Sequence, residues 1–309
     1  MKNRIYGVIG IRSIMANWNA DFTGYPKTIS TGDIFGSDKA LKYPMKKMWE
    51  AMGEKILYMK SYKIDKGEMR PKSLKERYDE IFETDLKSIK DKTEVIKNLF
   101  EAIDVKNFGA TFAEEKNNIS ITGAVQIGQG FNKYADSYAE EQQILSPFRD
   151  SSKDDSEKGE ANQSTLGTKI VSDEAHYFYP FVVNPQMYKE YVKIGVTEGY
   201  TKEDYEKFKE AALTSATFFN SNSKIGCENE FSIFVEVKEG YYLPDLAQYI
   251  KFTKTEAGER IIELEFNELL NQVKDNIISI EIYYNNLNLK LKHEISGAKK
   301  YNIFTRKEV

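Results

Sequence analysis

The chain opens on a run of seven residues that is apolar on both faces of a strand. Residues 5–11, Ile-Tyr-Gly-Val-Ile-Gly-Ile, are rich in β-branched side chains and carry no charge. A half-exposed strand alternates apolar and polar residues, whereas a strand covered on both faces does not. The run therefore predicts a central strand, with other elements packed on each side of its sheet.

Helices and strands are interleaved along the rest of the chain. A helix is predicted between Ser37 and Met52, which begins either near Pro44 or at Asp38 with a kink. Further helical patterns follow Ser73 and Thr201, which stand at cap positions. Further helices are predicted around 95–103 and 266–273. Strands are predicted at 55–62, 119–127, 176–181 and 231–237, with a hairpin of 277–284 and 287–295 that turns at Asn285-Asn286. With no repeat or clean linker, this order predicts one elaborated α+β domain over residues 1–309.

Composition excludes several classes of protein. One cysteine rules out an internal disulfide framework and a Cys-rich zinc module, and two histidines leave little material for a metal site or a Ser-His-Asp triad. A net charge of −4 argues against nucleic-acid binding by bulk charge. No window resembles a membrane span or a signal peptide. We expect a soluble cytoplasmic protein with no membrane partner, no cofactor and no metal.

The individual residues that could carry chemistry give weak signals. Gly123, Gly128 and Gly130 follow a strand but lack the Lys-Ser/Thr of a phosphate-binding loop, so we interpret them as tight backbone geometry. His293 is interpreted as structural, and nothing beside Cys227 suggests a lowered thiol pKa. A metal could bind the carboxylates of one loop, although such residues are usually solvated or cap helices: Asp21, Asp33 and Asp38.

Charge is unevenly distributed. Residues 1–60 hold ten Lys and Arg against five Asp and Glu, whereas 135–175 hold four against ten. The basic part combines side chains that can donate hydrogen bonds to phosphate with one aromatic ring that could stack on a base. A protein that binds single-stranded nucleic acid needs both, and the residues are Arg12, Ser13, Asn17, Trp18, Asn19, Ser37, Lys39, Lys42 and Lys46. The three lysines lie on one side of a predicted helix, near its N-terminus. A solvated helix face explains the same spacing equally well.

Residues 150–165 form the least apolar part of the chain. They are dominated by Ser, Asp, Glu, Lys and Gln, a composition that cannot offset its own ordering entropy. We expect the segment to be mobile in the isolated protein and to become ordered in an assembly.

Several blocks together resemble the backbone subunits of Cascade complexes from type I-B CRISPR systems, in the RAMP superfamily. The blocks appear in the family's order and cover most of the chain up to about residue 249: 3–19, 34–44, 108–113, 119–132, 173–181 and 222–230. The resemblance implies a modified RNA-recognition, ferredoxin-like fold, with a helical insertion at about 60–107 and a protruding thumb at about 134–170. It also implies a helical filament of copies along a CRISPR RNA, in which the thumb of one copy presses on the RNA held by the next.

What the resemblance implies for function is an RNA-binding scaffold without catalytic activity. Its partners would be CRISPR RNA, further copies of the chain, other Cascade subunits and the target DNA strand paired to the guide. The predicted RNA contacts comprise the basic set named above, the strand end at Gln126, Gln129, Phe131, Asn132 and Lys133, the thumb residues Phe148 and Arg149, and His176. From its aromatic surroundings, His176 is more readily interpreted as a packed residue than as a contact. The aromatic motif of RNA-recognition sheets is missing, so base stacking on the sheet face is not implied.

The alternative function is metal-dependent RNA cleavage. Related backbone subunits of type III systems cut target RNA with a loop aspartate, and Asp21 or Asp33 could take that role. A small-molecule-binding protein is a third, less specific interpretation.

Overall fold

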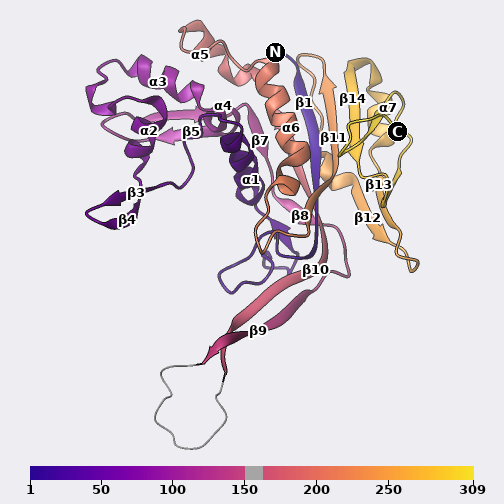
Figure 1. Cartoon of the computed structure of the whole chain (residues 1–309). Coiled ribbons are helices and arrows are strands. Elements are labelled where there is room, and N and C mark those ends of the chain that lie inside the picture. Colours follow the sequence, from indigo (N-terminus) through magenta and orange to yellow (C-terminus); the bar gives the residue numbers. More distant parts are fainter. Residues whose placement is uncertain (150–162) are drawn as a thin grey trace, which may run out of the picture.

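The structure is a computed structural model that describes residues 1–149 and 163–309, without the side chains of 146–149 and 163–166. Most of residues 150–165, whose mobility the sequence predicts, therefore lies outside the described residues. One nine-stranded sheet organises the molecule, in the order β16-β14-β11-β1-β10-β8-β2, with β7 and β9 also paired to β10 (Figure 1). Strand β1 (Arg4–Ala16) lies at its centre between β10 (Gln163–Val183) and β11 (Cys227–Val237), antiparallel to both. Its residues 5–11 are all buried, which confirms the prediction of a covered central strand.

The remaining strands of the large sheet are short, apart from β9 and β14. They are β2 (Phe35–Gly36), β7 (Val125–Ile127), β8 (Gly130–Asn132), β9 (Ala139–Arg149), β14 (Ile277–Tyr284) and β16 (Lys299–Asn302). Three smaller sheets pair β3 (Tyr62–Asp65) with β4 (Glu68–Pro71), β5 (Gly109–Phe112) with β6 (Ile119–Thr122), and β13 (Arg260–Leu264) with both β12 (Ile250–Lys254) and β15 (Leu289–Lys292).

Two hydrophobic cores lie on the two faces of the large sheet. Along β1, Ile5, Ile9 and Ile11 join the core beneath the helices, whereas Tyr6 and Val8 join a second core with the C-terminal segment. This alternation explains why the strand is apolar on both faces. The helices of the described chain are α1 (Asp38–Ala51), α2 (Leu74–Phe82), α3 (Lys92–Glu101), α4 (Ile103–Phe108), α5 (Lys189–Lys193), α6 (Lys202–Phe218) and α7 (Asn267–Gln272). None of them is long and apolar enough to cross a membrane.

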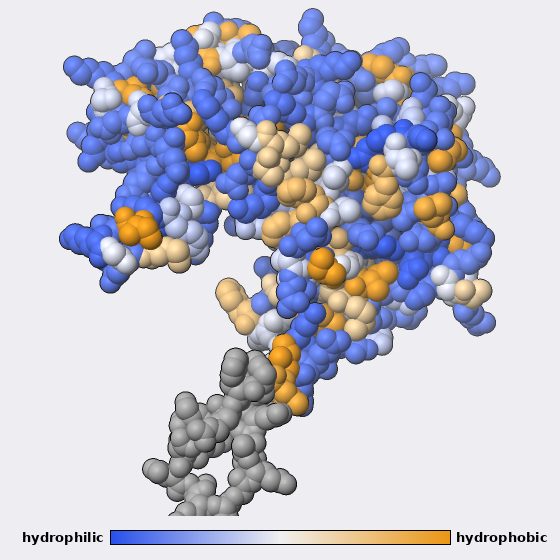
Figure 2. Space-filling model, in the orientation of Figure 1, coloured by the Kyte–Doolittle hydropathy of each residue, from blue (hydrophilic) through white to orange (hydrophobic). Residues whose placement is uncertain are grey.

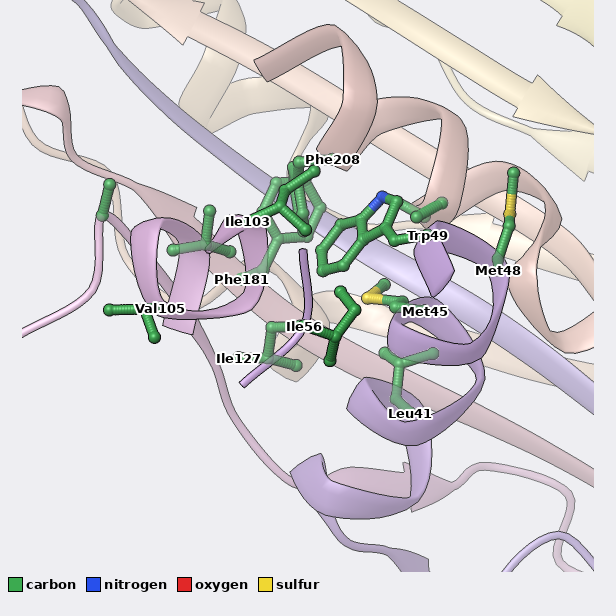
Figure 3. Packing of buried hydrophobic residues seen from close by; sticks show 14 of the residues in the cluster. Leu41, Met45, Met48, Trp49, Ile56, Ile103, Val105, Ile127, Phe181 and Phe208 are labelled. Carbon is green, nitrogen blue, oxygen red and sulfur yellow. The ribbon is translucent and has the colours of Figure 1, made fainter. Parts of the chain in front are cut away.

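Helix α1 supplies the centre of the first core. Its side chains Met45 and Trp49 point toward Phe181 of β10 and Phe208 of α6 (Figure 3), and Leu41 and Met48 belong to the same core. The Trp49 indole N–H donates to the carbonyl of Lys207 at 3.2 Å, which ties α1 to α6. The helix begins at Asp38, with Ser37 as its N-cap, and Pro44 lies inside it. Of the two helix starts that the sequence allowed, the one at Asp38 is therefore confirmed.

Local signals predicted the helix starts well. Ser73 and Thr201 each form a capping box with the acid three residues later, Glu76 and Asp204. The helix that follows Ser73 is shorter than the apolar pattern suggests, because it ends at Phe82 and Glu83 adopts a left-handed conformation.

Three strand predictions were wrong. Most of residues 55–62 has no regular structure before β3 begins at Tyr62. The pattern at 119–127 is divided at Gly123 into β6 and β7, which belong to different sheets. The predicted C-terminal hairpin does not form, since β14 pairs with β11 and β16 while β15 pairs in parallel with β13. Each error concerns long-range pairing, which alternation along one segment does not specify.

The β9–β10 pair forms a long antiparallel ribbon that leaves the body of the molecule (Figure 1). It falls within the predicted thumb at about 134–170, and β3, β4 and α2–α4 occupy the predicted insertion at about 60–107. The β3–β4 hairpin projects toward the same side, and Figure 2 shows open space between this hairpin and the ribbon.

Candidate nucleic-acid interface

The large sheet ends in a small aromatic edge formed by β2 and β8, which we call the β2–β8 edge. Phe35 pairs with Phe131 and Gly36 with Gly130, and the two phenyl rings lie 6.0 Å apart. Both rings are half-buried, so each keeps a surface toward solvent. The backbone N–H of Asn132 donates to Ile34 at 2.9 Å and extends the pairing.

Gly36 and Gly130 let this edge pack directly against the buried rings of Trp18 and Tyr179. A Cβ at Gly36 would lie 1.8 Å from the Tyr179 hydroxyl, and one at Gly130 would lie 2.4 Å from the Tyr179 ring. The Trp18 indole N–H donates to that hydroxyl at 2.5 Å, with Trp18 1% exposed. The predicted stacking role of Trp18 is therefore wrong, because its ring belongs to the floor of the edge and offers no face to a base.

Three lysines belong to the segments that form or adjoin the edge, and we call them the edge lysines: Lys27, Lys39 and Lys133. Lys27 accepts the backbone N–H of Phe35, and its ammonium lies 5.7 Å from the Phe35 ring. Lys39 is exposed in the first turn of α1, three residues after β2, and Lys133 directly follows β8. Within residues 1–149 and 163–309, no carboxylate pairs with any of the three. Their charges therefore remain available to an anionic ligand.

The other cations of the predicted set are already paired. Arg12 binds Glu228 through two nitrogens, at 2.5 and 3.1 Å. Lys42 pairs with Asp38 at 2.8 Å. Lys46 donates to the carbonyl of Tyr58 at 3.1 Å and lies 3.4 Å from the buried carboxylate of Asp104. The expected row of three free lysines on one helix face is thus corrected to Lys39 alone, because the other two are engaged within the protein.

Four polar residues of the predicted set lie in the second half of β1 or between β1 and α1. Ser13 and Asn17 are buried and donate to the carbonyls of Ala16 and Gly24. Asn19 accepts the backbone N–H of Ser37, and the Ser37 hydroxyl accepts that of Ala40. Direct ligand contact by the Ser13 or Asn17 side chain is excluded in this conformation, since both are covered by protein.

His176 is also a structural residue, which corrects its place among the predicted contacts. Its fully buried imidazole lies 2.6 Å from Glu230 and 3.0 Å from Glu174, and it stacks on Phe252 at 3.7 Å. Glu174 also accepts from Lys254 and Arg260, both at 2.5 Å, which joins the β12–β13 sheet to β10.

The protonation of this cluster follows from its geometry. Burial by itself would lower the pKa of His176, but the carboxylates of Glu230 and Glu174 outweigh burial and raise the pKa. Burial opposes ionisation of Glu174, yet hydrogen bonds from His176, Arg260 and Lys254 hold its pKa well below the ordinary value. A backbone hydrogen bond from His176 to the Asn132 side chain at 2.8 Å connects the cluster to β8.

The last predicted contacts lie near the edge or outside the described side chains. Gln126 and Gln129 are exposed, and the Gln126 amide donates to the carbonyl of Gly123 at 2.9 Å. Asn132 bonds to the backbone of Tyr134 through both atoms of its amide. Phe148 and Arg149 belong to β9, but their side chains fall outside the described residues.

The loop aspartates each have partners within the protein. Asp21 accepts from the backbone and hydroxyl of Thr23, and this hydrogen bonding lowers the pKa of Asp21. Asp33 accepts the Thr31 hydroxyl at 2.6 Å, and Asp38 pairs with Lys42. Among the described residues, no group of three or more His, Cys, Asp or Glu is placed to hold a metal ion.

The cysteine and the second histidine give no sign of chemical activation. Burial raises the pKa of the Cys227 thiol and lowers the pKa of the His293 imidazole.

Sequence reasoning missed Lys27 and Phe35. The two-residue strand β2 has no periodicity of its own, and its partner β8 lies almost a hundred residues away. The Phe-Gly-Ser sequence before the helix cap was the only local signal.

Fold and edge together define a mixed α/β protein built on a largely antiparallel sheet. Residues 3–280 match the family described as CRISPR-associated protein Cas7, and the chain belongs to this family. A solved chain described as "CRISPR RNA-guided surveillance complex, pre-nicking" has 18% identity and a TM-score of 0.56, with 96% of each chain covered, which shows a shared fold. Another, from a "CRISPR RNA-guided surveillance complex", has 13% identity and a TM-score of 0.46 over 93% and 95% of the two chains. No curated protein matches.

Proposed function

We propose that this chain is a non-catalytic, RNA-binding backbone subunit of a type I-B Cascade complex. Family membership supports a role in a CRISPR complex. The single observation that carries RNA binding is the β2–β8 edge, where half-buried rings lie in or beside segments that carry three lysines without a carboxylate partner in the described chain. Cations that track phosphates beside aromatic faces are the usual means of holding a single strand.

The proposed partners follow from this role. CRISPR RNA would run along the edge, further copies would bind the same RNA side by side, and other Cascade subunits and the target DNA strand would join the assembly. In this proposal the RNA-recognition-like palm would be the large sheet with α1 and α6, and the thumb would be the β9–β10 ribbon. In the cytoplasm such a complex would need no cofactor from this chain.

The test replaces the edge lysines with alanine. Each phosphate contact on a single strand contributes about 0.7 to the slope of log affinity against log salt, so losing three should flatten the slope by about 2. At 0.1 M salt the same counterion term corresponds to about a 100-fold loss of affinity for single-stranded RNA. Fluorescence anisotropy of a labelled RNA over a salt series measures both quantities.

The matched control is Lys189→Ala, Lys193→Ala and Lys290→Ala, which removes the same charge from α5 and β15. It should leave the salt slope unchanged. Equal slopes for the edge variant and wild type would contradict the assignment of the edge. Cleavage of the RNA in Mg²⁺, abolished by Asp21→Ala or Asp33→Ala, would replace the scaffold proposal with the enzymatic one.

A further inference from the structure

Phe22 is the most exposed aromatic side chain of the described residues. Its exposed fraction is 111%, against 64% for Tyr242, the next aromatic, whose ring is covered by the Arg4 guanidinium at 4.8 Å. Phe22 has no such cover in the described chain. A phenyl ring held entirely in water gains free energy when a partner covers its apolar surface.

The turn that carries Phe22 is rigid. The Asp21 carboxylate accepts from Thr23 at 2.7 and 2.8 Å and from the Tyr25 backbone at 3.2 Å, and the Asp21 N–H donates to Tyr25 at 2.8 Å. Gly24 takes φ +92°, a conformation that favours glycine, and its carbonyl accepts from the buried Asn17 amide at 2.8 Å. The ring is therefore held outward by a braced turn and does not hang on a loose loop.

This turn is continuous with the β2–β8 edge. Ala20 bridges to Pro26, the next residue is Lys27, and the Lys27 carbonyl accepts the backbone N–H of Phe35. The opposite side of the turn meets the base of the ribbon, where the Tyr25 hydroxyl donates to Glu141. An exposed ring thus stands between the ribbon and an edge lysine that has no carboxylate partner among the described residues.

We propose that Phe22 stacks on a base of the single-stranded RNA whose phosphates contact the edge lysines. The inference rests on the proposed function and adds to it the base-contacting ring that Trp18 cannot supply. The ring's neighbours Asp21 and Thr23 are polar and exposed, and Tyr25 is the only other exposed large apolar side chain of this turn, at 38%. The apolar surface of the turn is therefore two side chains, smaller than a protein interface requires. A flat ring beside a lysine that has no carboxylate partner in the described part of the chain suits a nucleobase and its phosphate.

The first experiment places a fluorescent reporter at the position with Phe22→Trp. The native tryptophans Trp18 and Trp49 are each 1% exposed, so the added, solvent-exposed indole dominates the red-shifted emission. Stacking on a base should quench this emission when unstructured, mixed-sequence RNA is added. The control is Phe304→Trp, a 45% exposed position that follows β16 at the opposite edge of the sheet. It should not be quenched, and equal quenching at the two positions would overturn the proposal.

The second experiment separates stacking from simple apolar contact. Phe22→Leu keeps an apolar side chain but removes the π face on which a base would stack. We expect about a tenfold loss of affinity on RNA, and no loss on an abasic sugar-phosphate strand of equal length. The salt slope should be unchanged, because no phosphate contact is removed.

The outcomes distinguish this inference from the proposed function. If wild type binds RNA with a steep salt slope but Phe22→Leu binds equally well, the stacking assignment fails and RNA binding stands. If wild type does not bind RNA, the proposed function fails first. If Phe22→Leu alters self-association without RNA and leaves affinity for RNA intact, the ring contacts protein and the proposal is overturned.

Discussion

Replacing His176 with alanine is expected to lower the free energy of unfolding by about 3–5 kcal/mol. The change removes the partner of Glu230 and one partner of Glu174, whose side chains are both nearly inaccessible to water. A buried carboxylate without its partner cannot recover its hydration, and the stacked contact with Phe252 is lost as well. Urea-induced unfolding followed by circular dichroism measures the difference.

The matched control is His293→Ala. His293 is half-buried, and its ring accepts one backbone hydrogen bond, from Ile295 at 3.2 Å. We expect a loss of less than about 1 kcal/mol, which is the typical net contribution of one hydrogen bond. Similar losses for the two variants would show that the cluster around His176 does not stabilise the fold.

The same cluster predicts the direction of a pH effect. The pKa of His176 in the folded protein is raised above its ordinary value of 6.5, so folding is favoured by the protonated ring. This contribution is fully present below pH 6.5 and is lost as the pH rises through the folded-state pKa. Unfolding free energies measured upward from pH 6.5 should fall in wild type by more than in His176→Ala.

Substituting Gly123 with alanine is the second large change, with an expected loss of about 3 kcal/mol. A Cβ at this position would lie 2.3 Å from the carbonyl oxygen of Asn107, 2.3 Å from the carbonyl carbon of Phe108 and 2.4 Å from the nitrogen of Gly109. All three atoms belong to the backbone, so no side-chain rotation relieves the contact. The thermal unfolding midpoint should fall accordingly.

Ser120→Ala is the control for this prediction. Ser120 is exposed on β6, three residues before Gly123, and its replacement should change stability by less than about 0.5 kcal/mol. If Gly123→Ala unfolds at the same temperature as Ser120→Ala, then the two backbones do not cross as closely as the structure shows.

The sequence predicted those features of the fold that depend on neighbouring residues, namely buried strands and helix caps. The buried strand at 5–11 and the caps at Ser73 and Thr201 were found where expected, because burial periodicity and capping depend on neighbouring residues. Pairing between distant segments was not predictable in this way. The alternation at 119–127 continues through Gly123, and only the crossing with Gly109 shows that one apparent strand is two.

The candidate site was predicted as a region and missed in part as a set of residues. The basic N-terminal sixty residues do contain Lys27 and Lys39, and the strand end at 130–133 does adjoin them. The pair of Lys42 with Asp38 is an i,i+4 contact within α1, which the sequence spacing permits but does not require. The carbonyl of Tyr58, which engages Lys46, is a tertiary contact that residue type alone could not reveal. Nor could it separate the buried ring of Trp18 from the exposed ring of Phe22.

The most direct test of the backbone-subunit proposal is analytical ultracentrifugation of the purified chain with unstructured single-stranded RNAs of increasing length. If the chain is an RNA-binding backbone subunit, the complexes should grow by whole copies of the protein as the RNA lengthens, and the edge-lysine variant should lose this growth at moderate salt. The same series in high salt should release the RNA. A chain that sediments alone with every RNA, at low as well as moderate salt, would contradict the proposal.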